Sequence, residues 1–84
     1  MEESTLEELR KQIDKVDKEI MKLLEERIRI CRRIAKCKLK LSLPLEDPQR
    51  EKLVLKRAGV FENVFREVIK LCKKAQEEIT HGQV

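Results

Sequence analysis

The chain has 84 residues, of which 43% are charged and 40% hydrophobic, and 20 Lys and Arg residues outnumber 16 Asp and Glu residues. A chain of this length is expected to form one small domain, residues 1–84, whose mild basic excess suits an anionic ligand or a nucleic acid. No stretch approaches the roughly 20 apolar residues of a membrane span, and no apolar segment follows the acidic start to form a secretory signal, so we expect a cytoplasmic protein without a membrane partner.

The first predicted element is a helix from about Thr5 to Leu41. Ser4-x-x-Glu7 and Thr5-x-x-Glu8 both fit a capping box, in which two side chains bond the free amides at a helix start. Apolar residues then recur at alternating spacings of three and four, which predicts a helix with one apolar seam. The seam positions are Leu6, Leu9, Ile13, Val16, Ile20, Leu23, Arg27, Ile30, Ile34, Cys37 and Leu41. One of them, Arg27, is charged.

A second, shorter helix follows a break in the pattern at residues 42–46. Pro44 ends the first helix because proline cannot continue the backbone hydrogen bonds. Asp47 is then a natural N-cap, and proline at the next position suits the first residue of a helix. We predict this helix over Pro48–Ala58, with Gly59 as its C-cap.

The third predicted helix begins near Glu62 or Asn63 and fades before Gly82. Its apolar stripe consists of Phe61, Val64, Phe65, Val68, Cys72, Ala75 and Ile79. No alternating strand pattern competes with these helices. The sequence therefore predicts an all-α fold with three helices per chain.

The first helix is too long for a compact domain of this size. At 1.5 Å per residue it extends for roughly 55 Å, whereas a compact globule of 84 residues is only about 30 Å across. The two shorter helices can cover only part of its apolar face. The simplest partner for the rest is a second copy, so we predict an intertwined homodimer.

The sulfur and imidazole groups predict no metal site. Cys31, Cys37 and Cys72 show no Cys-x-x-Cys spacing, and we interpret them as reduced, buried small residues. The one histidine, His81, lies near the end of the chain. These residues form neither a zinc site nor a catalytic triad, and we expect no metal and no cofactor.

Arg27 is the most informative residue, because it occupies a seam position and a buried guanidinium needs an anionic partner. The partner is a ligand carboxylate or a Glu of another helix, or else Arg27 sets the register of a coiled coil, and spacing alone does not choose. Lys38 lies eleven residues later, roughly 20° around the helix and about 16 Å along it, so both can face one cavity. Alternatively, Lys38 is simply one of the solvent-exposed basic residues that surround it in the sequence. Arg10, about 25 Å from Arg27, reaches such a cavity only from the other copy of an antiparallel dimer.

Polar residues also gather on the shorter helices. Asp47, Arg50 and Glu51 share a face at the start of the second helix, where the alternative is a cap with a surface ion pair. Cys72 and Gln76 lie one turn apart at the edge of the third helix's apolar stripe. By itself, this position favours a partly exposed glutamine.

Taken together, these segments resemble the all-helical class of chorismate mutases. The likeness runs from about Leu6 to Gln76 and rests on LEELRKQIDKVDKEIMKLLEER, the step to Lys38, PLEDPQRE and IKLCKKAQ. Each motif alone is weak, but LR-x-x-ID-x-x-D, ER-x(10)-K and D-x-x-RE are fairly specific in combination.

The resemblance implies an isomerase that converts chorismate to prephenate by a Claisen rearrangement, in phenylalanine and tyrosine biosynthesis. It also implies a homodimer with two active sites, each completed by the long helix of the other copy. Arg10 from one copy and Arg27 from the other would bind the two substrate carboxylates. Lys38 and Gln76 would donate hydrogen bonds to the ether oxygen of the breaking bond, and these two residues with Arg27 would be catalytic.

The same resemblance assigns the remaining side chains to substrate binding. Glu51, with Asp47, would hold the ring hydroxyl, and Arg50 would line the site. Cys72 stands where relatives often carry a small polar residue, and a thiol is a poor donor, so we expect it to line the pocket only.

Three other functions fit the sequence less well than a chorismate mutase. A related branch of the fold removes pyruvate from isochorismate, and the acidic Asp47 and Glu51 favour the mutase over that lyase. A basic adaptor that binds nucleic acid is less favoured, because the chain lacks a stacking aromatic platform and acidic residues interrupt its basic ones. A purely structural coiled coil fits Arg27 and Pro44 poorly.

Overall fold

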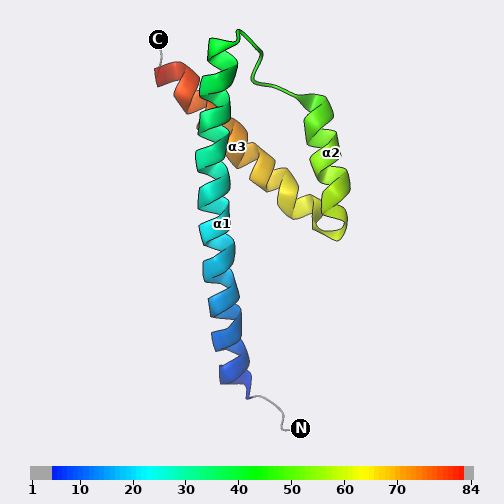
Figure 1. Ribbon diagram of the computed structural model, residues 1–84. Coiled ribbons are helices and arrows are strands. Elements are labelled where there is room, and N and C mark those ends of the chain that lie inside the picture. The colour runs from blue at the N-terminus through cyan, green and yellow to red at the C-terminus, as the bar shows by residue number, and fades with distance from the viewer. Residues whose placement is uncertain (1–4, 83–84) are drawn as a thin grey trace.

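The computed structural model describes residues 5–82, and all the regular structure among them is helical (Figure 1). The elements are α1 (Leu6–Lys40), α2 (Pro48–Ala58), the short 3-10 helix η1 (Gly59–Phe61) and α3 (Glu62–Gly82). No strand occurs in this described part, which confirms the all-helical prediction. No helix in residues 5–82 is long and apolar enough to cross a membrane.

The start of α1 is fixed by a capping box. Thr5 Oγ1 accepts from the Glu8 amide at 3.1 Å, and the Glu8 carboxylate accepts from the Thr5 amide at 3.3 Å. The other predicted box uses Ser4, which lies outside the described residues. The C-cap is Leu41, and Ser42 then takes a left-handed backbone conformation (φ 56°) that turns the chain away. The predicted bounds of the first helix are confirmed to within one residue.

The second half of the chain differs from the prediction of three separate helices. The Asp47 carboxylate accepts from the Arg50 amide at 3.1 Å and starts α2 as expected. Gly59, with φ +56°, ends α2, but η1 leads directly into α3 without a non-helical residue. The chain therefore forms one long helix and one bent helical arm. The left-handed region that glycine adopts readily allows this sharp bend.

The end of α3 also differs from the prediction. The helix continues to Gly82 rather than fading before it. Thr80 supports its last turns, because its hydroxyl donates to the Glu77 carbonyl oxygen at 2.8 Å.

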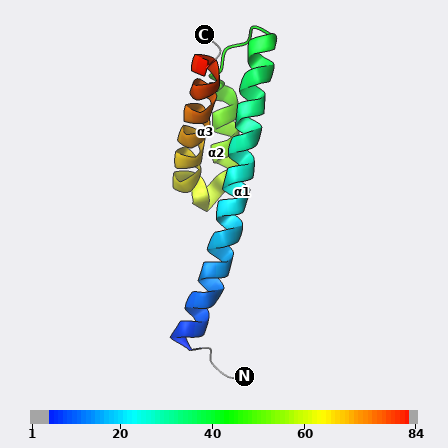
Figure 2. The same cartoon turned by 90° about the vertical axis from the view of Figure 1, so that its left-hand side faces the viewer.

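The helical arm packs against only part of α1. Figures 1 and 2 show α3 crossing the C-terminal half of α1, with α2 set apart from α1 and in contact with α3. The small apolar core lies at the α1–α3 crossing and consists of Cys31, Ala35, Val68, Ile69 and Ala75. The molecule is elongated, 59 × 26 × 15 Å, with a radius of gyration of 17.2 Å.

The N-terminal half of α1 projects beyond the arm (Figure 2). Its seam side chains are between 46% and 65% exposed: Leu6, Leu9, Ile13, Val16, Ile20 and Leu23. A continuous apolar stripe of this kind is typical of a surface that packs against another protein. The expectation that one copy covers only part of the seam is therefore confirmed.

Candidate active site

A cavity of about 440 Å³ lies where α1, α3 and the start of α2 face one another. It is lined by Arg27, Ile30, Cys31, Ile34, Lys38, Leu45, Asp47, Arg50, Glu51, Val54, Ile69, Cys72, Lys73 and Gln76. Seven of the eight residues singled out in the sequence lie in this wall: Arg27, Lys38, Asp47, Arg50, Glu51, Cys72 and Gln76. The eighth, Arg10, does not. Residues separated by more than half the length of the chain thus meet in one place.

Arg27 and Arg50 are two cations of the cavity wall that have no carboxylate partner among residues 5–82. The Arg27 guanidinium is half-buried and makes only a long contact, 3.7 Å, with the Cys31 sulfur. Its pKa is lowered from the ordinary value, first by burial and then by the charge of Arg50. Residues 5–82 form no salt bridge between Arg27 and a Glu, so the two guanidiniums favour an anion from outside the chain.

Lys38 is half-buried rather than fully solvated. Its ammonium donates to the Leu45 carbonyl oxygen at 2.8 Å, which ties the end of α1 to the loop before α2. An ammonium has three donors, so this bond leaves N–H groups for a ligand in the cavity.

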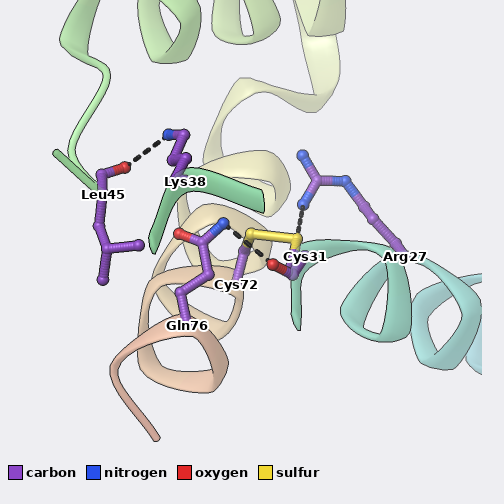
Figure 3. The surroundings of a disulfide bond; sticks show 6 residues. All are labelled: Arg27, Cys31, Lys38, Leu45, Cys72 and Gln76. Atoms are coloured by element: carbon purple, nitrogen blue, oxygen red, sulfur yellow. Dashed lines mark hydrogen bonds between the residues drawn. A yellow bond between two sulfur atoms is a disulfide. The ribbon is translucent and has the colours of Figure 1, made fainter. Parts of the chain in front are cut away.

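Gln76 is buried, with only 7% of its surface exposed, so the expectation of a partly exposed side chain is wrong. Its amide nitrogen donates to the Cys31 carbonyl oxygen at 3.2 Å across the α1–α3 interface (Figure 3). This bond fixes which end of the amide is nitrogen. The second N–H of the same group stays available to a bound molecule.

Cys31 and Cys72 form a disulfide, which corrects the prediction that the cysteines are reduced (Figure 3). Their Cα atoms are 5.7 Å apart, within the usual range for a disulfide, although 41 positions separate them in the chain. Cys37 is free and exposed, not buried as expected. The sequence does not reveal the disulfide, because Cys31 and Cys72 meet only when α3 docks on α1.

Sequence reasoning missed one charged residue of the wall, Lys73. Its ammonium lies 3.0 Å from a Glu51 carboxylate oxygen and 3.7 Å from one of Glu46. The pKa of Lys73 is raised, chiefly by the hydrogen bond to Glu51. A lysine one residue after Cys72 and three before Gln76 shares part of their helix face, and this spacing was the signal available.

Arg10 lies on the projecting half of α1 and is exposed. Seventeen residues of helix place it about 25 Å from Arg27 along the axis. It lies beside the exposed seam residues Leu9 and Ile13.

The charges of the wall indicate which ligand fits. Four cations (Arg27, Lys38, Arg50, Lys73) outnumber two carboxylates (Asp47, Glu51), which leaves an excess of two positive charges. Among the described residues that line the wall there is no His, Ser or Thr, and the two cysteines are joined. Residues 5–82 contain no group of three or more side chains placed to hold a metal ion. The arrangement can bind and orient an anionic small molecule, and it offers no activated nucleophile.

The sequence is similar to one protein family and to several known proteins. The family profile described as chorismate mutase type II matches residues 9–60. A bifunctional chorismate mutase/prephenate dehydratase from Aquifex aeolicus is 37% identical across 88% of this chain, and a 3-dehydroquinate dehydratase from Pyrobaculum aerophilum is 41% identical across 81%. A chorismate mutase from Methanocaldococcus jannaschii is 38% identical across 82% of this chain. These matches span 24%, 23% and 60% of the relatives' own lengths, respectively.

A solved structure shows the same fold. A conserved hypothetical protein from Pyrococcus furiosus superposes with a TM-score of 0.85 at 44% identity, covering 89% of this chain and 99% of that one. The family match covers α1, α2 and η1 almost completely, which are the elements that carry five of the cavity's six charged side chains. The chain belongs to the chorismate mutase type II family.

Proposed function

We propose that this chain catalyses the rearrangement of chorismate to prephenate, as a homodimer with two shared active sites. One observation carries the proposal. Two guanidiniums, Arg27 and Arg50, which have no carboxylate partner among residues 5–82, lie in one cavity with two anchored donors, Lys38 and Gln76. Membership of the chorismate mutase type II family supports the same reaction.

Substrate binding follows from the charge of the wall. Chorismate carries two carboxylates, and the cavity has an excess of two positive charges. We assign one carboxylate to Arg27, whose planar group forms two parallel hydrogen bonds to such an anion. Binding also relieves the repulsion between Arg27 and Arg50 that lowers the pKa of Arg27. Arg10 of the partner subunit would bind the second carboxylate.

The reaction needs no nucleophile and no proton transfer. The carbon–oxygen bond breaks as a new carbon–carbon bond forms within one molecule, and the ether oxygen gains negative charge on the way. Lys38 and Gln76 would donate to that oxygen, each with an N–H that its backbone contact leaves available. Preorganised donors of this kind stabilise a developing oxyanion by about 3 kcal/mol each. Holding the substrate in a compact, chair-like pose supplies the entropic part of the rate increase.

The remaining residues of the wall would fix the substrate's orientation. Glu51, with Asp47, would accept from the ring hydroxyl, and Arg50 would face the anionic side of the substrate. Cys72 has no S–H donor because its sulfur is bonded to Cys31, so it lines the pocket only. The lining role expected for Cys72 is kept in this proposal.

The dimer is supported by the surface that one copy leaves uncovered. Six apolar side chains between Leu6 and Leu23 remain 46–65% exposed, over a stretch of helix about 25 Å long. Arg10 lies within this stretch, so the contact that buries the seam can also carry Arg10 into the site of the partner subunit. We propose that residues 1–84 act as one domain in this arrangement.

Incubation with chorismate tests the proposal directly. We expect loss of its ultraviolet absorbance faster than the uncatalysed background, with prephenate as the product and little activity in Arg27→Ala. Sedimentation equilibrium on the same sample is expected to give a dimer. Untouched chorismate would contradict the proposed activity, and pyruvate release from isochorismate would then identify the lyase of the same fold.

A cytoplasmic location is part of the same proposal. An enzyme that takes its substrate from amino-acid biosynthesis acts in the compartment where that substrate is made. The Cys31–Cys72 disulfide makes the location worth measuring, since disulfides are rare in most reducing compartments. Fractionation of the source cells, followed by immunoblotting, tests it.

A further inference from the structure

Lys73 joins the two elements of the arm that border the cavity. It lies on α3, directly after Cys72, and its ammonium is 3.0 Å from the carboxylate of Glu51 in the first turn of α2. The loop residue Glu46 contributes a weaker contact at 3.7 Å. Both Lys73 and Glu51 belong to the cavity wall.

This ion pair differs from the exposed pairs on the same helix. The Lys73 and Glu51 side chains are 37% and 27% exposed, whereas those of Lys70 and Glu67, which also form a pair on α3, are 72% and 69% exposed. Charges that are partly withdrawn from water interact more strongly and are less screened by salt. The raised pKa of Lys73 agrees with this, because it means that Glu51 favours the ammonium form.

The contact with Lys73 leaves one carboxylate oxygen of Glu51 available to a ligand. The ammonium lies 3.0 Å from one carboxylate oxygen, Oε1, and no donor within residues 5–82 forms a hydrogen bond to the other. A carboxylate accepts through both oxygens, so the second can receive a hydrogen bond from a ligand in the cavity. Apart from the contact with Lys73, the Glu51 carboxylate forms no ion pair or side-chain hydrogen bond within residues 5–82.

We infer that Lys73 is a positioning residue for the reaction: it holds the Glu51 carboxylate against the cavity so that its free oxygen accepts from the substrate's ring hydroxyl. The inference rests on the proposed function, because it needs chorismate to be the substrate. It adds Lys73 to the residues that determine binding, acting through Glu51 and not on the reacting atoms.

A double-mutant cycle tests this role. Steady-state kinetics with chorismate are measured for the wild type, Lys73→Ala, Lys73→Arg, Glu51→Gln and the double variant Lys73→Ala/Glu51→Gln. Lys70→Ala is the matched control, since Lys70 lies on the same helix and pairs outside the cavity. Thermal unfolding is recorded for every variant.

We expect Lys73→Ala to lower kcat/KM about tenfold, mainly through a higher KM, because the ring hydroxyl is held in the ground state and the transition state alike. Lys73→Arg keeps the ion pair and should recover most of the loss. In the Glu51→Gln background, Lys73→Ala should lower kcat/KM by less than about twofold, because the carboxylate that Lys73 positions is already absent. Lys70→Ala should have the kcat/KM of the wild type. Lys73→Ala should lower the unfolding temperature only slightly more than Lys70→Ala does, because its ion pair is still partly exposed.

The outcomes separate this inference from the proposed function. An active wild type with equal losses from Lys73→Ala in both backgrounds would overturn the inference and leave the activity standing. The inference would also be overturned if Lys73→Ala had the same kcat/KM as Lys70→Ala, or if Lys73→Ala lost activity together with a large drop in unfolding temperature. A wild type that leaves chorismate untouched would overturn both.

Discussion

The side-chain amide of Gln76 donates to the backbone carbonyl of Cys31 at 3.2 Å, although 45 positions separate the two residues in the chain. The same cysteine is bonded to Cys72, one turn before Gln76 on α3, so two links hold α3 to α1 beside the cavity. Because the amide is anchored through one N–H, the direction of the other is fixed. This is the preorganisation that the proposed reaction requires of a donor.

Gln76→Glu is expected to make the activity depend on acid pH. A carboxylate must be protonated to donate either to the Cys31 carbonyl or to the substrate, and burial raises its pKa above the ordinary value of about 4.3. The acid form exists below that pKa, so activity should be present at low pH and fall as the pH rises through it. We expect a loss of at least about 100-fold at pH 7, measured as kcat/KM between about pH 4 and 9.

The neighbouring variant Glu77→Gln is the control for this profile. Glu77 is exposed and does not line the cavity, so its removal should leave the pH dependence unchanged. Full activity of Gln76→Glu at neutral pH would remove Gln76 from the mechanism.

Arg27→Ala is expected to remove most of the activity without harming the fold. Losing a charge-assisted bidentate contact costs about 3 kcal/mol, or roughly 100-fold or more in kcat/KM. The lowered pKa of Arg27 shows that its charge is less stable in the fold than in water. Removing it should therefore leave the unfolding temperature unchanged or higher, as followed by circular dichroism. Arg29→Ala, on the same helix but exposed and outside the cavity, should keep full activity.

A large loss of helicity in Arg27→Ala would instead indicate that the residue has a structural role.

Mixing Arg10→Ala chains with Lys38→Ala chains is expected to restore activity. In a mixed dimer, one site receives the intact Lys38 of its own chain and the intact Arg10 of the other. With random exchange, about a quarter of all sites should be complete. The measurement is chorismate turnover after subunit exchange has been confirmed by native mass spectrometry.

The matched control mixes Arg27→Ala with Lys38→Ala. Both residues line the cavity within one chain, so every mixed site lacks one of them and no activity should return. If the two mixtures recovered the same chorismate turnover, this result would contradict a site shared between subunits.

Breaking the Cys31–Cys72 disulfide is expected to lower the free energy of unfolding by about 4 kcal/mol. The bond closes a loop of 41 positions and thereby restricts the unfolded chain. Urea unfolding with and without reductant, together with the Cys31→Ala/Cys72→Ala variant, measures the difference. Cys37→Ser should have no effect, because this thiol is free and exposed.

Thiol counting checks the bond itself. The unfolded, unreduced protein should react with one equivalent of a thiol reagent, at Cys37, and the reduced protein with three. Three reactive thiols before reduction would contradict the disulfide.

The sequence by itself determined the helices and much of the site. The Thr5–Glu8 box, the Asp47 N-cap and the Gly59 C-cap all depend on residues within a few positions of one another, and such short-range signals survive any tertiary arrangement. A helix is also rigid, so the eleven-residue spacing alone predicted that Arg27 and Lys38 face one cavity, as they do in the structure.

Only the tertiary structure decided the contacts between helices. The crossing of α3 over α1 brought Cys31 to Cys72 and buried Gln76, and the continuous turn from α2 into α3 set Lys73 against Glu51. Spacing along a chain fixes the face on which a side chain lies but not what that face meets. The angle and depth at which two helices dock depend on the packing of all their side chains together, and residues 41 or 45 positions apart become neighbours only through that packing.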